Sequence, residues 1–302
     1  SIGGSENMMR TPGWVIGMLL LLAAATAAAA PEGRVTILYD AFGHKPGFTQ
    51  DWGFAALIEH AGRRILFDTG NDPRIFAANA RAAGVDLGRL DFAVISHRHL
   101  DHTAGIAHLL SANPGITLYV PKEPFGIFGG SLPNAFFRRD ASLEPQERYF
   151  GGHPPDELTS GTAFPGAHWA YIDKTTEIAP GVHVIALVSD APGTREMREL
   201  SLAIRTSAGL VLVVGCSHPG IERIVEAASA IDPHLHIVFG GFHMPAASDA
   251  EISRVAGALH DRWKVEQLAP GHCTGEPTFA HFKKVWGAAY RHAGVGSVIE
   301  LP

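Results

Sequence analysis

The sequence has 302 residues, of which 46% are hydrophobic, and its formal net charge at pH 7 is −6. This length and apolar content are sufficient for one large domain with a substantial core. The negative charge argues against nucleic acid as a partner. The 17 histidines are an unusual number and point towards metal chemistry.

Residues 1–30 are expected to lie outside the folded domain. Residues 1–7 look like a remnant of cloning, Arg10 supplies a positive charge, residues 14–25 are apolar, and the small residues 27–30 suit a signal peptidase. This order is typical of a secretory signal peptide. The alternative is a transmembrane anchor, but the apolar stretch is shorter than the ~20 residues that a span needs. We therefore expect no stable membrane anchor after cleavage, and a periplasmic or secreted protein.

Residues 31–302 are predicted to form the domain, and its first half alternates strands with helices. Apolar or alternating runs predict strands, and runs with helical periodicity that end at glycine predict helices. The expected strands cover residues 34–39, 54–59, 64–67, 90–96 and 116–120, with a hairpin turn at 61–63, and the expected helices cover 73–83 and 103–111. This mixture predicts an α/β architecture.

Residues 121–180 break this pattern, because glycine, proline and aromatic residues dominate there. A long irregular stretch inside a compact domain is usually functional, and its aromatic content argues against disorder. We interpret the segment as an irregular insertion that covers or faces the substrate. The alternative is a surface excursion that is packed for structural reasons.

The second half of the domain returns to strands and helices and resembles the first half in pattern. Strands are expected at residues 182–188, 202–206, 210–215 and 236–239, and helices at 221–231, 250–263 and 279–292.

A histidine-rich loop follows the predicted strand at residues 90–96. It reads His97-Arg98-His99-Leu100-Asp101-His102. Imidazole and carboxylate groups are ligands of zinc, iron and manganese. In extended backbone, His97 and His99 project to the same side and can hold one ion, whereas Asp101 and His102 lie where the chain turns and can face a second ion. The loop therefore predicts a site for two divalent metal ions, zinc in the first place and manganese or iron as alternatives.

Two later histidines complete the predicted ligand set, because each lies just past the end of a strand: His218 follows the strand at 210–215, and His272 follows residues 268–271. The assignment to one ion is His97, His99 and His218, and to the other Asp101, His102 and His272. His243, which follows the strand at 236–239, is a further candidate. It could be a ligand, a hydrogen-bond donor to the substrate or a proton shuttle near neutral pH.

These motifs resemble those of the metallo-β-lactamase superfamily over nearly the whole of residues 31–302. The similarity includes the histidine-rich loop, the segment 65–70 that contains Asp68, and the segments 215–220, 240–243 and 270–275. The last three are similar to a branch of pterin-related proteins, several of which are named after a synthase of methanopterin biosynthesis. The resemblance implies the fold of that superfamily, a four-layer αββα sandwich.

The sequence departs from the family pattern in two places. Many relatives have a histidine in a turn where this chain has Ser189 and Asp190, and the second departure is at a ligand. Many relatives place there an aspartate that bridges the two ions, whereas this chain has Cys216, Ser217 and His218. We expect Cys216 and Cys273 to be small buried residues near the site; a disulfide between them and direct ligation by a cysteine are alternatives. Asp68 is expected to accept a hydrogen bond from a ligand histidine.

The predicted site favours a hydrolase that uses a metal-activated hydroxide on small-molecule esters, of the phosphoester or lactone type. Asp101 would also orient the hydroxide, so Asp101 and His243 are the predicted catalytic residues. The alternatives are an exported metal- or ligand-binding protein with little catalysis, and a di-iron oxidoreductase. The expected partner is a small-molecule substrate, and the sequence leaves its identity and the oligomeric state open.

Overall fold

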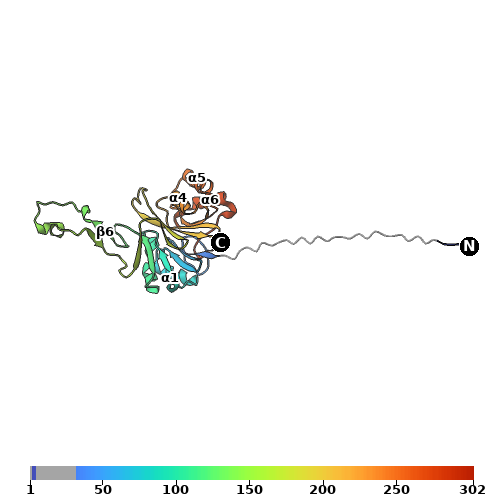
Figure 1. Ribbon diagram of the computed structural model, residues 1–302, viewed down its shortest axis with the longest axis horizontal. Helices are drawn as coiled ribbons and strands as arrows, with labels where there is room; N and C mark the ends of the chain where they lie inside the picture. The colour runs from blue at the N-terminus through green and yellow to red at the C-terminus, as the bar shows by residue number, and fades with distance from the viewer. Residues whose placement is uncertain (1, 5–31) are drawn as a thin grey trace. The chain divides into compact units, whose positions relative to one another are not determined.

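The computed structural model describes residues 2–4 and 32–302, so the predicted signal peptide lies outside the described residues. From Gly33 onwards, strands and helices alternate and build two large β-sheets (Figure 1). Among the described residues, no helix has the length and apolar character needed to cross a membrane.

Seven strands form the first sheet, in the order β15-β1-β2-β3-β4-β5-β8. They are β1 (Gly33–Tyr39), β2 (Ala55–His60), β3 (Arg63–Phe67), β4 (Phe92–Val94), β5 (Thr117–Pro121), β8 (His168–Ile172) and β15 (Val298–Leu301). The pairs from β3 to β8 are parallel. The predicted hairpin joins β2 to β3, and Ala61 and Gly62 both have the positive φ that a tight hairpin turn requires.

Six strands form the second sheet, in the order β14-β13-β12-β11-β10-β9. They are β9 (Thr176–Ala179), β10 (Val182–Val188), β11 (Arg198–Thr206), β12 (Gly209–Val214), β13 (Leu235–Gly241) and β14 (Gln267–Gly271). The strands β12, β13 and β14 run parallel. Because parallel strands end at the same edge of a sheet, these three deliver their following loops to one place.

Apolar side chains fill three layers of core. Alternate residues of both sheets, among them Val35, Phe67, Leu202 and Phe239, pack between the sheets. The outer faces are covered by helices, α1 (Pro73–Ala82) and α3 (Ile106–Ala112) on the first sheet and α4 (Ile221–Ile231), α5 (Asp249–Gly257) and α6 (Glu276–Trp286) on the second. The predicted four-layer αββα arrangement is confirmed.

The segment 121–180 is more regular than the sequence predicts. Strands β8 and β9 fall within it and belong to the two large sheets. Two more strands, β6 (Gly130–Pro133) and β7 (Glu157–Ser160), pair as a separate antiparallel ribbon, which extends away from the large sheets (Figure 1). These strands are short and half-exposed, so they leave little apolar periodicity in the sequence. The insertion is therefore confined to residues 122–167.

The helix predicted at 103–111 is divided in two. The helix α2 (Leu100–Thr103) begins three residues earlier, so Asp101 and His102 lie on a helix rather than in a loop. Gly105 lies between α2 and α3. A side chain does not fit at this position, because a Cβ would lie 2.4 Å from the carbonyl oxygen of Thr69. The helix predicted at 250–263 is present as α5 followed by a π-helix over Ala258–Arg262, whereas the helix predicted at 279–292 ends earlier, at Trp286.

Candidate metal centre

The predicted ligands lie just beyond the carboxyl ends of strands from both sheets. Four residues at these strand ends, Asp68, Ser217, His243 and His272, have positive φ values of 59°, 62°, 51° and 46°. This left-handed backbone is uncommon for residues with a side chain and clusters at functional sites. Sharp turns at four strand ends thus surround a single site.

His97, His99 and His218 form one cluster, which we call the three-histidine group. Their ring nitrogens lie within 4.8 Å of one another. His97 Nε2 is 3.1 Å from His99 Nδ1, and the ring centroids of His97 and His218 are 4.7 Å apart. Burial lowers the pKa of His97 well below its usual range, and the neighbouring histidines lower it further. The ring is therefore neutral, which is the form that ligates a metal.

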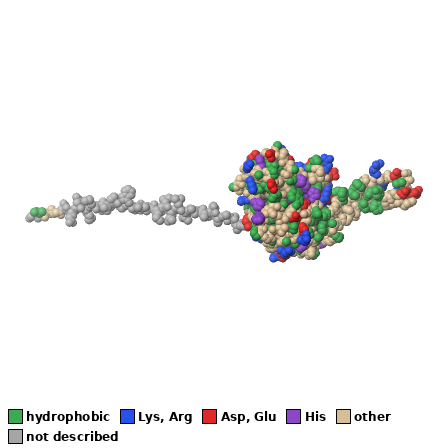
Figure 2. Space-filling view, turned by 180° about the vertical axis from the view of Figure 1, so that it is seen from behind, with side chains coloured by type: hydrophobic (Ala, Val, Ile, Leu, Met, Phe, Trp, Pro, Cys, Tyr) green, Lys and Arg blue, Asp and Glu red, His purple; other side chains and the backbone are tan. Residues whose placement is uncertain are grey.

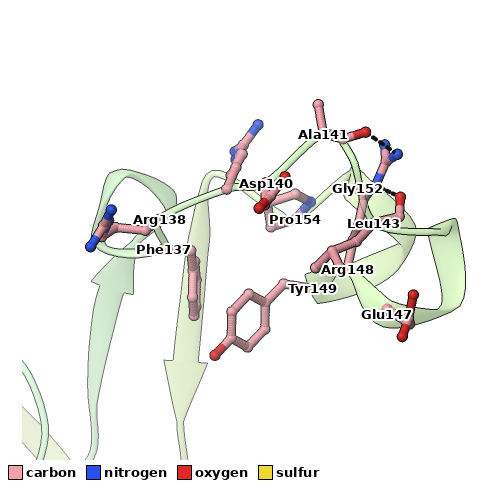
Figure 3. A pocket seen from close by; sticks show the side chains of 11 residues that line it. Phe137, Arg138, Asp140, Ala141, Leu143, Glu147, Arg148, Tyr149, Gly152 and Pro154 are labelled. Atoms are coloured by element: carbon pink, nitrogen blue, oxygen red, sulfur yellow. Dashed lines mark hydrogen bonds between the residues drawn. The ribbon is translucent and has the colours of Figure 1, made fainter.

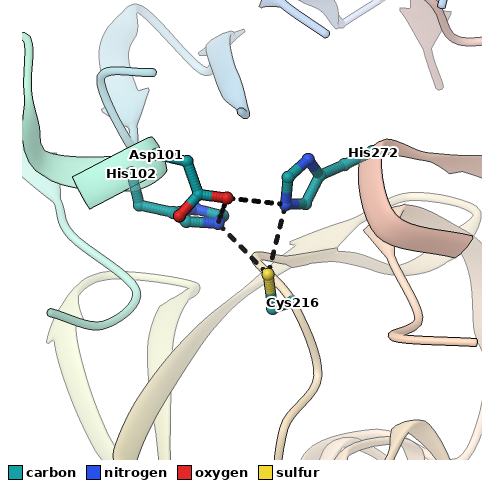
Figure 4. Close-up of side chains that lie close together, drawn as sticks. All are labelled: Asp101, His102, Cys216 and His272. Carbon is teal, nitrogen blue, oxygen red and sulfur yellow. Dashed lines mark hydrogen bonds and ion pairs between the residues drawn. The ribbon is translucent and has the colours of Figure 1, made fainter. Parts of the chain in front are cut away.

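Asp101, His102, Cys216 and His272 form a second cluster, which we call the mixed group (Figure 4). Cys216 Sγ lies 3.2 Å from His102 Nε2 and 3.2 Å from His272 Nε2. The carboxylate of Asp101 lies 3.4 Å from His272 Nε2 and 3.6 Å from His102 Nε2. The two groups divide the six predicted ligands in the way that the sequence predicts, and Cys216 joins the second.

Cys216 contacts the candidate ligands directly, whereas the sequence predicts only a small buried residue near the site. Its sulfur faces two imidazoles from opposite sheets, at the strand end where the superfamily pattern expects an aspartate. Cys216 and Cys273 are both buried and unbridged. The geometry therefore favours Cys216 as a direct ligand, which was the alternative interpretation.

Asp68 holds the ring of His102 in place, as expected. Its Oδ2 lies 2.6 Å from His102 Nδ1, and Ser96 donates to both carboxylate oxygens through its backbone N–H and its hydroxyl. Burial of His102 lowers its pKa, but the carboxylate of Asp68 outweighs this and raises it to about 9. Without a metal ion the ring is therefore protonated at both nitrogens, and a metal ion that replaces the proton on Nε2 leaves the Nδ1 proton donated to Asp68.

Glu199 is a functional residue that the sequence reasoning missed. It is fully buried on β11 and accepts hydrogen bonds from the backbone N–H groups of Cys216, Ser217 and His218, at 3.0, 2.6 and 2.8 Å. Its Oε2 is also 2.9 Å from His218 Nδ1. One carboxylate therefore shapes the loop and fixes the tautomer of a candidate ligand. The signal in the sequence that could have pointed to Glu199 is its position as an acidic residue directly before the largely apolar run 200–204.

Asp40, at the end of β1, has a related role that the sequence also did not reveal. Its carboxylate accepts the backbone N–H groups of Phe42 and His272, at 2.9 and 3.0 Å. It therefore fixes the backbone of a candidate ligand from the other sheet. Burial raises the pKa of Asp40 to about 7.

His243 lies at the rim of the site and is exposed. Its ring centroid is 4.5 Å from that of His218, and its ring lies near the sulfurs of Cys216 and Cys273. A hydrogen bond with Cys273 raises the pKa of His243. An exposed imidazole beside the three-histidine group can exchange protons with solvent and with a substrate.

The donor atoms in these clusters fit two divalent cations. In each group, nitrogen, oxygen or sulfur atoms of different side chains face one another at close range. In the three-histidine group, burial lowers the pKa values of His97 and His99, and a cation stabilises neutral imidazoles whose lone pairs face one another. Asp101 adds a negative charge: burial opposes its ionisation, but its contacts with His272 and His102 keep its pKa below the usual range.

The insertion carries a separate cavity of about 260 Å³ (Figure 3). Its lining residues all fall between 137 and 154, and none belongs to the metal centre. The rings of Phe137 and Tyr149 face each other there at 4.8 Å. Exposed apolar and charged side chains gather on this segment (Figure 2). Near its base the insertion is linked to the histidine-rich segment, where Arg98 donates to Glu123 at 2.8 Å. The expected contact between the insertion and a substrate stays a prediction.

Comparison with known proteins agrees with this architecture. Residues 63–239 match the model of the β-lactamase superfamily domain, and the chain belongs to this superfamily. The resemblance inferred from the sequence is thereby confirmed. A solved structure described as a metal-dependent hydrolase of the β-lactamase superfamily is 25% identical, with a TM-score of 0.67, and the match covers 89% of this chain and 99% of that one.

Two further relatives extend the comparison. A protein of Methanocaldococcus jannaschii named 7,8-dihydropterin-6-methyl-4-(β-D-ribofuranosyl)-aminobenzene-5′-phosphate synthase is 27% identical in an alignment 293 residues long that covers 88% of this chain and 95% of the relative. The metallo-β-lactamase fold protein YhfI of Bacillus subtilis is 18% identical with a TM-score of 0.54, covering 90% of this chain and all of that one. The second likeness concerns the fold alone.

Proposed function

We propose that the protein is a hydrolase of small-molecule esters, of the phosphoester or lactone type, that works with two divalent metal ions. The observation that supports this most is the pair of adjacent ligand groups, one with three histidines and one with Asp101, His102, Cys216 and His272. The match over nearly the full length to a structure described as a metal-dependent hydrolase supports the same reaction class. The thiol of Cys216 favours zinc over manganese, because soft sulfur ligands select zinc.

The metal ions and the side chains have separate tasks in this proposal. Two bound cations would acidify water and neutralise the charge that develops on the ester. Asp101 is the member of the mixed group that meets solvent, since its side chain is 17% exposed and those of His102 and His272 are fully buried. Its ionised carboxylate can accept a hydrogen bond from the attacking water and orient it. His243 is placed to donate a proton to the leaving group.

Metal analysis and one substitution test this proposal. Purified protein should contain about two equivalents of zinc and should hydrolyse members of a panel of phosphoesters and lactones. Asp101→Asn keeps the shape of the side chain but removes its charge, and should lower kcat at least 100-fold. Asp173→Asn, at an exposed ion pair with Lys122, is the matched control and should leave kcat unchanged.

The result also separates the hydrolase from the other interpretations. Full metal content without turnover of any ester would favour a binding protein, or a synthase such as the one that the M. jannaschii relative is named as. Unchanged kcat in Asp101→Asn would rule out the role given to this carboxylate.

A further inference from the structure

A half-exposed tryptophan lies directly beside the candidate metal centre. Trp52 is 49% exposed, and its ring centroid is 5.0 Å from that of His272, at an angle of 52°. Single exposed aromatic residues are common in folded proteins, so the significance of this indole lies in its contact with a candidate ligand and in the cavity that it lines.

The loop that carries Trp52 is held firmly against the metal centre. The next residue, Gly53, has a φ of 144°, and a Cβ there would lie 2.6 Å from the carbonyl oxygen of Asp101. The same carbonyl accepts the N–H of Phe54 at 3.2 Å. On the other side, the carboxylate of Asp51 accepts hydrogen bonds from Tyr39 and Asn71. The chain on both sides of Trp52 is thus held in place, although half of the residue's surface is open.

Trp52 lines a cavity of about 310 Å³ that opens beside His272. The other lining residues are Phe42, Pro245, Cys273, Gly275, Glu276 and Pro277. Most of this lining is apolar, and none of it is arginine or lysine. The carboxylate of Glu276, on an exposed residue at the start of α6, can only accept hydrogen bonds when ionised. The cavity therefore favours a flat ring with N–H donors over an anionic group.

We propose that this cavity binds a flat nitrogen-containing ring of the substrate, which stacks on Trp52 and turns its N–H groups towards Glu276. This inference rests on the proposed function, because the ring would position the ester of the same molecule over the two ligand groups. It assigns the selection of the substrate to Trp52 and Glu276, whereas the sequence points to the insertion.

Direct binding to the metal-loaded protein tests the proposal without any turnover. The probes are 2-aminobenzimidazole, which is flat and carries N–H donors, and benzofuran, which is flat and carries none. Titration calorimetry should give 2-aminobenzimidazole the lower Kd. Trp52→Ala should raise the Kd of both probes about tenfold, and Trp52→Phe should restore much of the affinity. Glu276→Gln should weaken 2-aminobenzimidazole only.

Controls distinguish this site from the insertion and from the metal ions. Phe136→Ala removes another exposed aromatic, which is 66% exposed and lies on the insertion, and should change neither Kd. Metal content and thermal stability should be the same in all variants. Unchanged affinity in Trp52→Ala, or an equal loss in Phe136→Ala, would overturn the proposal. If the probes bind as predicted but the protein hydrolyses no ester, the proposed ring site is supported and the proposed hydrolase activity is wrong.

Discussion

Glu199 shows how one buried side chain organises the candidate metal centre at the residue scale. Four hydrogen-bond donors of the β12–α4 loop converge on its carboxylate, three of them backbone N–H groups. In the low dielectric of the interior such charge-assisted hydrogen bonds are strong, and losing one leaves a donor without a partner. The position of His218 and Cys216 therefore depends on a residue from a neighbouring strand.

Glu199→Gln should weaken metal binding. The amide keeps the shape of the side chain but can accept at only one oxygen, so the loop donors and His218 Nδ1 lose partners. We expect an affinity for zinc that is about 10- to 100-fold lower, measured by competition with a chelator. Glu226→Gln, at an exposed ion pair with Arg262, is the control. Equal zinc affinity in Glu199→Gln and the wild type would contradict the role given to this carboxylate.

Asp40 should make the stability of the metal-free protein depend on pH. Burial raises its pKa from the ordinary 3.8 to about 7. Between these values the folded protein retains a proton that the unfolded chain loses, so the free energy of unfolding falls as pH rises, and this effect ends above about pH 7. Over this pH range, the free energy of unfolding of the chelator-treated wild type should fall by on the order of 3 kcal/mol more than that of Asp40→Asn, as measured by urea unfolding. Parallel pH profiles of the two proteins would contradict the prediction.

At the scale of elements, the site depends on how the parallel strands end. Strand β13 passes β12 so closely at Gly240 that a Cβ would lie 1.9 Å from the carbonyl oxygen of Val214, and the φ of Gly240 is 108°. Only glycine fits such a backbone without strain. This close approach brings the loop of Cys216 and the loop of His243 to the same edge of the sheet.

Gly240→Ala should therefore destabilise the fold and disturb the centre. We expect a loss of about 3 kcal/mol in the free energy of unfolding, from the clash and the left-handed backbone together. Gly115→Ala is the matched control, since a Cβ at Gly115 meets no atom within 4 Å, and it should be close to neutral. Chemical denaturation of both variants measures the difference. A Gly240→Ala protein as stable as the control would show that the strands can separate without cost.

On the scale of the whole molecule, the candidate ligands connect the two sheets. His97, His99, Asp101 and His102 follow β4 of the first sheet, whereas His218 and His272 follow strands of the second. Metal ions bound between them would tie together the two halves that pack through the central core. Binding to the folded state alone stabilises it by mass action.

Removal of metal should lower the melting temperature. At a free zinc concentration about 1,000 times Kd, binding contributes roughly 4 kcal/mol, which corresponds to about 10 °C for a domain of this size. Calorimetry with and without a chelator measures this shift. His97→Ala should abolish most of this shift in melting temperature. His44→Ala, at an exposed histidine outside both groups, should leave the shift unchanged. A chelator that leaves the melting temperature of the wild type unchanged would argue against bound metal.

Most of the secondary structure could be predicted from the sequence because its signal is local. The apolar runs that became β1, β10, β12 and α4 have clear periodicity, and the turn at Ala61 and Gly62 is marked by glycine. The sequence does not predict five strands, each of which has four or five residues and little buried surface: β6, β7, β8, β9 and β15. Short edge elements form through their partners rather than through their own pattern.

The sequence alone determined the superfamily, the layered architecture and a set of candidate ligands. These could be predicted because the spacing of the histidines in the loop and after the strands is itself characteristic. Only the tertiary structure decided which side chains support them. Glu199, Asp40 and Trp52 come from strands or loops far from the ligands in sequence, and Cys216 enters the mixed group only through the meeting of two sheets. Burial and contact between distant segments are properties of the folded chain, so no local pattern could reveal them.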